Sequence, residues 1–171
     1  MILQFRHVNY KLAPRHLPEN FIAEVLNFMG NRQQVSPRRR GTAIVETDKG
    51  IIVAAGSRKV FLLPGGKADH HESRTQAAMR ELTEETGMRS LHARVIFRHL
   101  GEVEKSYGHG YFQDHHTVCL VEAVGTPRPR HEIKYIDFYK PGCSVPISGT
   151  TKEIIDKYYN WKMANTGESN W

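Results

Sequence analysis

Apolar residues from position 41 onward fall into short runs separated by turn residues, which is the pattern of β-strands. The runs at 42–45 and 51–55 flank Asp48-Lys49-Gly50, where the glycine suits the left-handed position of a hairpin turn. The sequence therefore predicts a hairpin at this point. Further apolar runs predict strands near residues 60–63, 93–100, 117–124 and 133–138.

A helix is predicted over residues 74–86, in the middle of this strand pattern. Ser73 and Gln76 form a capping box at its start, and Gly87 is a natural stop at its end. One side of the predicted helix carries a stripe of small and apolar residues, which is suited to packing on a sheet.

Helices are also predicted toward both ends of the chain. Residues 18–29 have one apolar face and are followed by Gly30, which ends the pattern. Near the other end, Thr150 with Glu153 makes a second capping box, and the helix that follows is expected to run to about Trp161.

The order of these elements predicts an α/β fold with a mixed β-sheet and a few helices. At 171 residues the chain is long enough for one domain with a proper core. We expect a single domain over residues 1–171. Residues 1–37 would form an N-terminal helical extension, and the core would span about 41–161.

Three glutamates share one side of the helix predicted over 74–86. At about 100° per residue, Glu81, Glu84 and Glu85 fall within a stripe about 100° wide. Like charges at this spacing repel, and the helix dipole disfavours anions near the C-terminal end. A divalent cation such as Mg²⁺ or Mn²⁺, which prefers oxygen ligands, removes both costs. From the helix alone, a metal site and a solvated acidic face explain the pattern equally well.

The residues around these glutamates fit a longer pattern. Reading from Gly66, the chain has five residues, Glu72, seven residues, and then Arg80-Glu81-Leu82-Thr83-Glu84-Glu85-Thr86-Gly87-Met88. Every fixed position of a Nudix box is filled, and the preceding Leu63-Pro64-Gly65 is similar to the usual lead-in. The segment 66–88, which is 23 of the 171 residues, therefore resembles the signature of the Nudix hydrolases.

The resemblance implies a fold, a reaction and a cofactor. The fold would be the Nudix α/β/α sandwich, and the reaction the hydrolysis of a pyrophosphate linkage in a nucleoside diphosphate linked to another moiety. Glu81, Glu84 and Glu85 would bind Mg²⁺, with Mn²⁺ as a substitute, and the backbone carbonyl of Gly65 would complete the metal shell. Glu81 would also orient or deprotonate the attacking water.

By the same resemblance, Glu72 and Arg80 would form an ion pair that holds the glycine loop against the helix. Their chemistry agrees, because a guanidinium can grip a carboxylate through two parallel hydrogen bonds. Direct contact between Arg80 and a substrate phosphate is the alternative.

Weaker signals surround this site. Arg58 and Lys67 flank the glycine loop and could reach substrate phosphates, although each is also acceptable on a surface. Tyr107 lies in a glycine-rich segment with several aromatic residues, where a ring could stack on a base or merely tuck inward. Glu132, an acid at the start of a predicted strand, is either a second candidate for the general base or a solvated strand end.

Composition limits the remaining possibilities. No run approaches the roughly 18 apolar residues of a membrane helix, and the first residues lack the order of a secretory signal, so we expect a cytoplasmic protein. The net charge of +6 suits an anionic partner. The dense cluster Arg38-Arg39-Arg40 is either a solvated strand entry or a phosphate contact. The two cysteines form no C-x-x-C pair, which excludes a structural zinc site of the usual cysteine type.

Two other functions compete with hydrolysis. A nucleotide-sensing Nudix module that has lost catalysis predicts a broken set of glutamates, whereas this set is complete. A nucleic-acid binder predicts basic and aromatic residues grouped in a known module, and none is visible. We therefore expect a small-molecule nucleotide as the partner and no membrane, with the oligomeric state, including a homodimer, left open. Nucleoside triphosphates, including oxidised ones, ADP-ribose-like sugars and dinucleotides all remain open as substrates.

Overall fold

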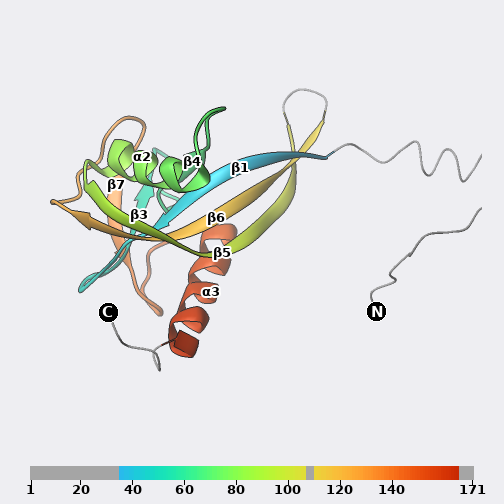
Figure 1. Cartoon of the computed structure of the whole chain (residues 1–171). Coiled ribbons are helices and arrows are strands. Elements are labelled where there is room, and N and C mark those ends of the chain that lie inside the picture. The colour runs from blue at the N-terminus through green and yellow to red at the C-terminus, as the bar shows by residue number, and fades with distance from the viewer. Residues whose placement is uncertain (1–34, 107–109, 166–171) are drawn as a thin grey trace, which may run out of the picture. The chain divides into compact units, whose positions relative to one another are not determined.

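The computed structural model describes residues 35–106 and 110–165, in two sheets and two helices (Figure 1). The helix expected over residues 18–29 lies outside the described residues. In the described ranges no helix is long and apolar enough to cross a membrane. In chain order the elements are β1 (Val35–Ile44), β2 (Glu46–Thr47), β3 (Gly50–Ala55), β4 (Gly65–Lys67), α2 (Arg74–Thr86), β5 (Arg89–Lys105), β6 (Tyr111–Val124), β7 (Tyr135–Tyr139) and α3 (Gly149–Asn165).

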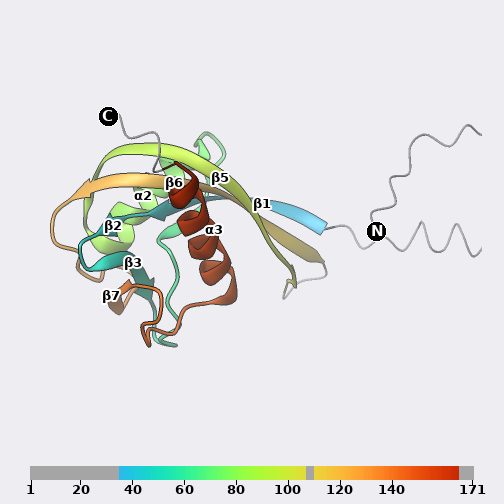
Figure 2. The same cartoon turned by 90° about the horizontal axis from the view of Figure 1, so that it is seen from below.

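The larger sheet has the strand order β4-β1-β6-β5, and the smaller one has the order β2-β3-β7. Strands β1 and β6 run parallel, whereas β4 and β5 pair antiparallel with their neighbours. The sheet is therefore mixed, as the sequence predicts. Helices α2 and α3 lie on opposite sides of it (Figure 2).

Alternation along the central strands divides the core into two clusters. On β1, Ala43 packs with residues of α2 such as Leu82, whereas its neighbour Ile44 packs with residues of α3 such as Ile154. Successive side chains of a strand point to opposite faces, so one apolar run serves both helices. The α/β/α sandwich expected from the sequence is confirmed.

Helix α2 begins and ends as the sequence predicts. Ser73 caps its first turn by accepting a hydrogen bond from the Gln76 backbone, and the Gln76 side chain accepts one from the Ser73 backbone. Gly87 ends the helix in the left-handed conformation, with φ of 68°. At Gly41 a Cβ would lie 2.0 Å from the Arg74 carbonyl oxygen, so only glycine lets the helix start approach β1 this closely.

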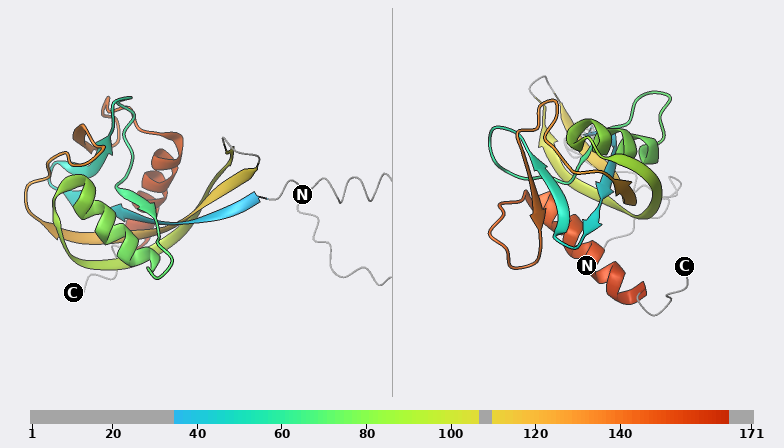
Figure 3. Two further views of the ribbon diagram at one scale, coloured as in Figure 1. Left: turned by 90° about the horizontal axis from the view of Figure 1, so that it is seen from above. Right: turned by 90° about the vertical axis from the view of Figure 1, so that its left-hand side faces the viewer.

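Strand β1 is longer than the apolar run predicts, since it begins at Val35 rather than near residue 42. The cluster Arg38-Arg39-Arg40 is therefore part of the strand itself rather than its entry, with alternating side chains. Strands β5 and β6 are also longer than expected. Together the three strands run on past both helices (Figures 1 and 3).

Two other predicted elements differ from the structure. The apolar run at 60–63 is not a strand; it makes only the isolated bridges Ala54↔Leu62 and Phe61↔Ile147. The cap of α3 is Ser148 rather than Thr150, because the Ser148 hydroxyl accepts a hydrogen bond of 3.2 Å from the Thr151 backbone. Glu153 instead lies 3.2 Å from His99 Nε2 on β5.

Candidate active site beside the glutamate helix

The C-terminal half of α2 lies directly against the glycine loop that leads into β4. A Cβ on Gly66 would stand 1.9 Å from Glu81 Oε1, so the Glu81 carboxylate rests on bare backbone. A Cβ on Gly65 would stand 2.4 Å from the Gly41 carbonyl oxygen on β1. The two glycines thus allow the helix, the loop and β1 to meet at one place.

Arg80 ties the loop to the helix. Its Nε and Nη2 donate to the two oxygens of Glu72, at 2.9 and 3.1 Å, and Nη2 also donates to the Lys67 carbonyl at 3.2 Å. This hydrogen bonding lowers the pKa of Glu72 and raises the pKa of Arg80. The ion pair expected between Glu72 and Arg80 is confirmed, with the two-point geometry that only a guanidinium provides.

The same guanidinium also gathers two of the three helix glutamates. Arg80 Nη1 donates to Glu81 Oε1 and to Glu84 Oε2, each at 2.9 Å. Glu84 is the most open of these partners, with 46% of its side-chain surface exposed. Arg80 therefore holds Glu81 and Glu84 near each other while Glu72 anchors it to the loop.

Glu85 lies outside this network and is half-buried. Burial, together with the nearby charges of Glu81 and Glu132, raises its pKa to about 8. A backbone hydrogen bond with Gly65 and the charge of Arg40 act in the opposite direction. The Glu85 carboxylate therefore lies in a site with an excess of negative charge, which favours the binding of a cation.

A cavity of about 310 Å³ opens beside Glu85 and Gly65. Its floor is the face of the larger sheet opposite α2, and its polar lining includes Arg40, Asp114 and His116. Arg40 Nη2 donates to the Gly65 carbonyl at 3.0 Å, and Arg40 Nε lies 3.6 Å from Asp114 Oδ2. The cavity therefore joins the glutamate site to a charged patch on β1 and β6.

His116 forms part of the same floor. Its Nδ1 lies 2.9 Å from Thr42 Oγ1, and the ring is buried. Burial, with the charge of Arg40, lowers the pKa of His116 to about 4. The imidazole is therefore neutral at pH 7, and it adds hydrogen-bonding capacity to the cavity floor without adding charge.

The oxygen atoms gathered here suit a hard divalent cation. Glu81 and Glu85 approach the Gly65-Gly66 backbone from one helix, and carboxylate and carbonyl oxygens are the ligands that Mg²⁺ and Mn²⁺ prefer. Over residues 35–106 and 110–165, no group of three or more acidic, histidine or cysteine side chains forms a ready-made metal site. The third helix glutamate, Glu84, is turned toward Arg80.

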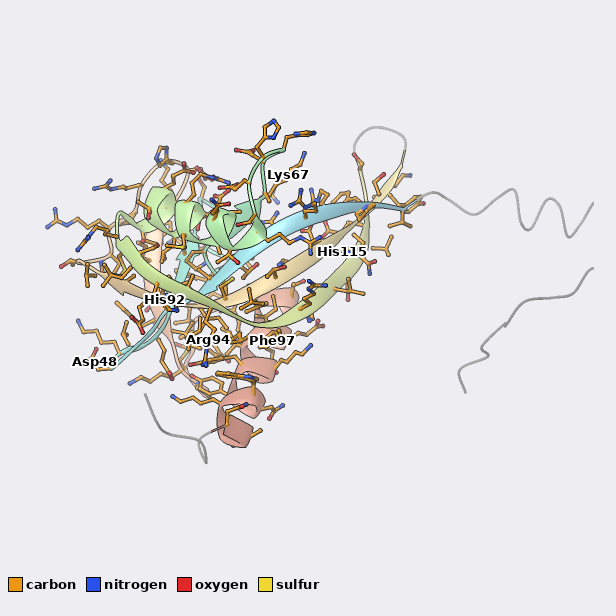
Figure 4. The ribbon with its side chains drawn as sticks, in the orientation of Figure 1. Asp48, Lys67, His92, Arg94, Phe97 and His115 are labelled. Carbon is orange, nitrogen blue, oxygen red and sulfur yellow. The ribbon has the colours of Figure 1, made fainter. Side chains whose placement is uncertain are left out.

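The structure describes three of the four weaker sequence candidates. Lys67 is exposed on β4, where its carbonyl accepts a hydrogen bond from Arg80 (Figure 4). Arg58 is exposed in the turn after β3, and Tyr107 lies outside the described residues. Glu132 is exposed, but its charge acts on Glu85. The roles of all four in substrate binding or catalysis stay predictions.

The sequence interpretation missed Asp114 and His116 and left Arg40 ambiguous. A strand pattern reaching back to residue 35 could have placed Arg40 on the cavity face, because Thr42 and Ile44 follow it at a spacing of two. Asp114 carries no local signal, since its partners Arg38 and Arg40 lie more than 70 residues earlier in the chain.

Comparisons with known proteins agree with this geometry. The NUDIX domain family matches residues 37–142, which is more than half of the chain. A Nudix hydrolase family member from Chromobacterium violaceum is 32% identical, with a TM-score of 0.63, over 75% of this chain and 81% of that one. No curated protein sequence matches significantly.

Two further solved structures share the fold at lower identity. One is a UDP-X diphosphatase, at 20% identity and a TM-score of 0.58, over 88% of this chain and 73% of that one. The other is a bifunctional NMN adenylyltransferase/ADP ribose pyrophosphatase from Francisella tularensis, complexed with AMP and a Mn ion, at 16% identity and a TM-score of 0.53. It aligns over 83% of this chain and 46% of that one. The family match, the complete box and the sandwich agree, and the chain belongs to the Nudix hydrolase family.

Proposed function

We propose that this Nudix hydrolase cleaves the pyrophosphate linkage of a nucleoside diphosphate joined to another moiety, and that it requires Mg²⁺. The observation that carries the proposal is the meeting of Glu81 and Glu85 with the Gly65-Gly66 backbone beside a nucleotide-sized cavity that Glu85 and Gly65 line. The raised pKa of Glu85 supports it, because the site concentrates negative charge that a dication would neutralise.

Glu81, Glu84, Glu85 and the Gly65 carbonyl would hold the ion. When bound, Mg²⁺ would offset the charge of the diphosphate and make a water molecule more acidic. Glu81 is the residue we assign to orienting or deprotonating the attacking water, with Glu132 as the alternative base. Arg80 has a positioning role, since it fixes Glu81 and Glu84 and is itself anchored by Glu72.

Arg40 is the residue we assign to the substrate phosphate in the cavity. Its guanidinium lies between Gly65 and Asp114, so it faces the cavity beside the proposed metal ligands. A permanently charged planar group is well suited to phosphate oxygens. A carbonyl oxygen has two lone pairs and a guanidinium has five N–H donors, so the Arg40–Gly65 hydrogen bond is compatible with both a phosphate on Arg40 and a metal on Gly65.

The distribution of the basic cluster disfavours the nucleic-acid alternative. Arg38 and Arg40 both pair with Asp114, and Arg39 donates to the Glu72 carbonyl at 3.2 Å. Because consecutive side chains of β1 point to opposite faces, the three cations do not form one open basic face. We therefore keep a small-molecule nucleotide as the partner. The cytoplasmic location and the homodimer stay predictions.

A substrate panel tests the proposal. Full-length protein is incubated with 5 mM Mg²⁺, and released mononucleotide, phosphate and pyrophosphate are measured. The panel holds ordinary and oxidised nucleoside triphosphates, ADP-ribose, nucleotide sugars and dinucleoside polyphosphates, the classes that the sequence leaves open. We expect turnover of at least one class, abolished by chelation and reduced by orders of magnitude in Glu85→Gln. Absence of turnover throughout, or equal turnover by Glu85→Gln, would overturn the proposal.

A further inference from the structure

A planar cation, the Arg38 guanidinium, is held in a fixed orientation on the sheet face that forms the cavity floor, just beyond the residues that line the cavity. Arg38 donates through Nε and Nη2 to the two oxygens of Asp114, at 2.7 and 3.0 Å. Its Cζ lies 3.5 Å from the centre of the Phe112 ring. The guanidinium therefore lies over the face of the ring. Phe112 therefore supports one face of the guanidinium, and Asp114 fixes its edge.

The arrangement follows from the strand register. Arg38 pairs with Asp114 and Arg40 with His116, and these four side chains share the cavity face of the sheet. Arg38 lies two residues before Arg40, which is about 7 Å at the rise of a strand. Successive contacts connect Gly65 to Arg40, Arg40 to Asp114, and Asp114 to Arg38. Arg38 is therefore farther from the helix glutamates than Arg40 is.

Asp114 and Phe112 do not cover the whole of the Arg38 guanidinium. Its side chain keeps 38% of its surface exposed, although one face and one edge are covered. What remains is the second face and Nη1. An arginine plane with one free face is a surface on which a nucleobase stacks, and stacking tolerates any base because every base has a π-face.

We infer that Arg38, backed by Phe112 and fixed by Asp114, is the stacking platform for the base of the nucleotide substrate. The inference rests on the proposed function and deepens it, since it places the base at the Arg38 end and the reacting phosphates at the Glu85 end. Phe112 and Asp114 act through Arg38 and are positioning residues. The substrate class is then a nucleotide that carries its base, whichever group lies beyond the diphosphate.

The inference is tested by comparing ligands with and without a base. Dissociation constants of AMP, GMP, UMP and CMP are measured by calorimetry on the full chain with Mg²⁺, beside that of ribose 5-phosphate. We expect at least one nucleotide to bind more tightly than ribose 5-phosphate by about 5- to 150-fold, the range that stacking of one base supplies. An equal affinity of the wild type for nucleotide and ribose 5-phosphate would overturn the inference.

Arg38→Lys separates stacking from charge, because lysine keeps the cation and loses the plane. The nucleotide advantage should fall to within about 2-fold, with the affinity for ribose 5-phosphate unchanged, and Phe112→Leu should reduce it in part. The matched control is Arg98→Lys on β5, whose partner Thr117 lies on the opposite face from Asp114. Arg98→Lys should keep the wild-type ratio.

An unchanged nucleotide advantage in Arg38→Lys would show that the arginine is only a structural ion-pair partner, and would overturn the inference. Should Arg38→Lys fold poorly, Phe112→Leu decides instead, since it leaves the Arg38–Asp114 pair in place. The proposed function has a separate test, because it is overturned when the wild type turns over no substrate. Binding of the mononucleotides does not depend on that result.

Discussion

The carboxylate of Glu81 lies against the backbone of Gly66, at a place where a Cβ would stand 1.9 Å from Oε1. Gly66→Ala should therefore displace the end of the Glu81 side chain rather than unfold the loop. A misplacement of about 1 Å can cost roughly 100-fold in rate. We expect turnover to fall by about that factor with a nearly unchanged melting temperature. Gly110→Ala, where a Cβ meets nothing within 4 Å, should behave as wild type.

Arg80→Lys tests the positioning role of the guanidinium. Lysine keeps the charge but cannot grip both oxygens of Glu72 while also reaching Glu81 and Glu84. Loss of such supporting contacts typically costs about 10- to 100-fold in metal affinity or activity. Turnover and Mn²⁺ affinity, measured on the same preparation, should fall together. Wild-type turnover together with wild-type Mn²⁺ affinity would show that Arg80 does not position the glutamates.

Glu85→Gln should separate activity from stability. The carboxylate is buried beside Glu81 and Glu132, so a neutral side chain of the same shape relieves both desolvation and repulsion. Without metal, we expect the variant to melt at the same temperature as wild type or a few degrees higher, while turnover falls by orders of magnitude. A clearly lower melting temperature would mean that the Glu85 charge stabilises the free protein.

His116 should make the fold sensitive to mild acid. Its pKa is about 4 in the folded protein and about 6.5 in an unfolded chain. As the pH falls below 6.5, the unfolded chain takes up a proton that the folded protein refuses, so the free energy of unfolding decreases. Between pH 7.5 and 5 this amounts to roughly 2 kcal/mol.

Urea unfolding of wild type and His116→Asn at these two pH values measures the effect. Asparagine can keep the hydrogen bond to Thr42 and does not titrate. The variant should lose less stability than the wild type over this range. Parallel losses in the two proteins would show that other groups, such as carboxylates, carry the acid sensitivity.

The sequence predicts the glutamate helix well because every signal there is local. The capping box, the glycine stop and the Glu72–Arg80 pair all depend on residues within one short segment, and each is present in the structure. The binary pattern also predicts the mixed sandwich, since most of the short apolar runs are buried strands between the helices, although the run at 60–63 is not.

The cavity floor could not be predicted from local pattern. Strand β5 is interrupted by register shifts at three places, which breaks the alternation that marks a strand. The pairing of Arg38 with Asp114 joins residues 76 positions apart and depends on the parallel register of β1 and β6. The capping-box pattern predicts Thr150 as the cap of α3, but serine is as good a cap as threonine, and the hydrogen bond from the Thr151 backbone identifies Ser148 instead.

The most direct test of the account is the binding of Mn²⁺ to the full-length protein, titrated by electron paramagnetic resonance. Wild type and Glu122→Gln, a change at an exposed strand residue, should bind the ion with the same affinity. The double variant Glu81→Gln/Glu85→Gln should lose that binding by at least about 10-fold, because both anionic oxygen ligands are gone. Equal Mn²⁺ affinity in all three proteins would contradict the central claim that these glutamates form the metal site.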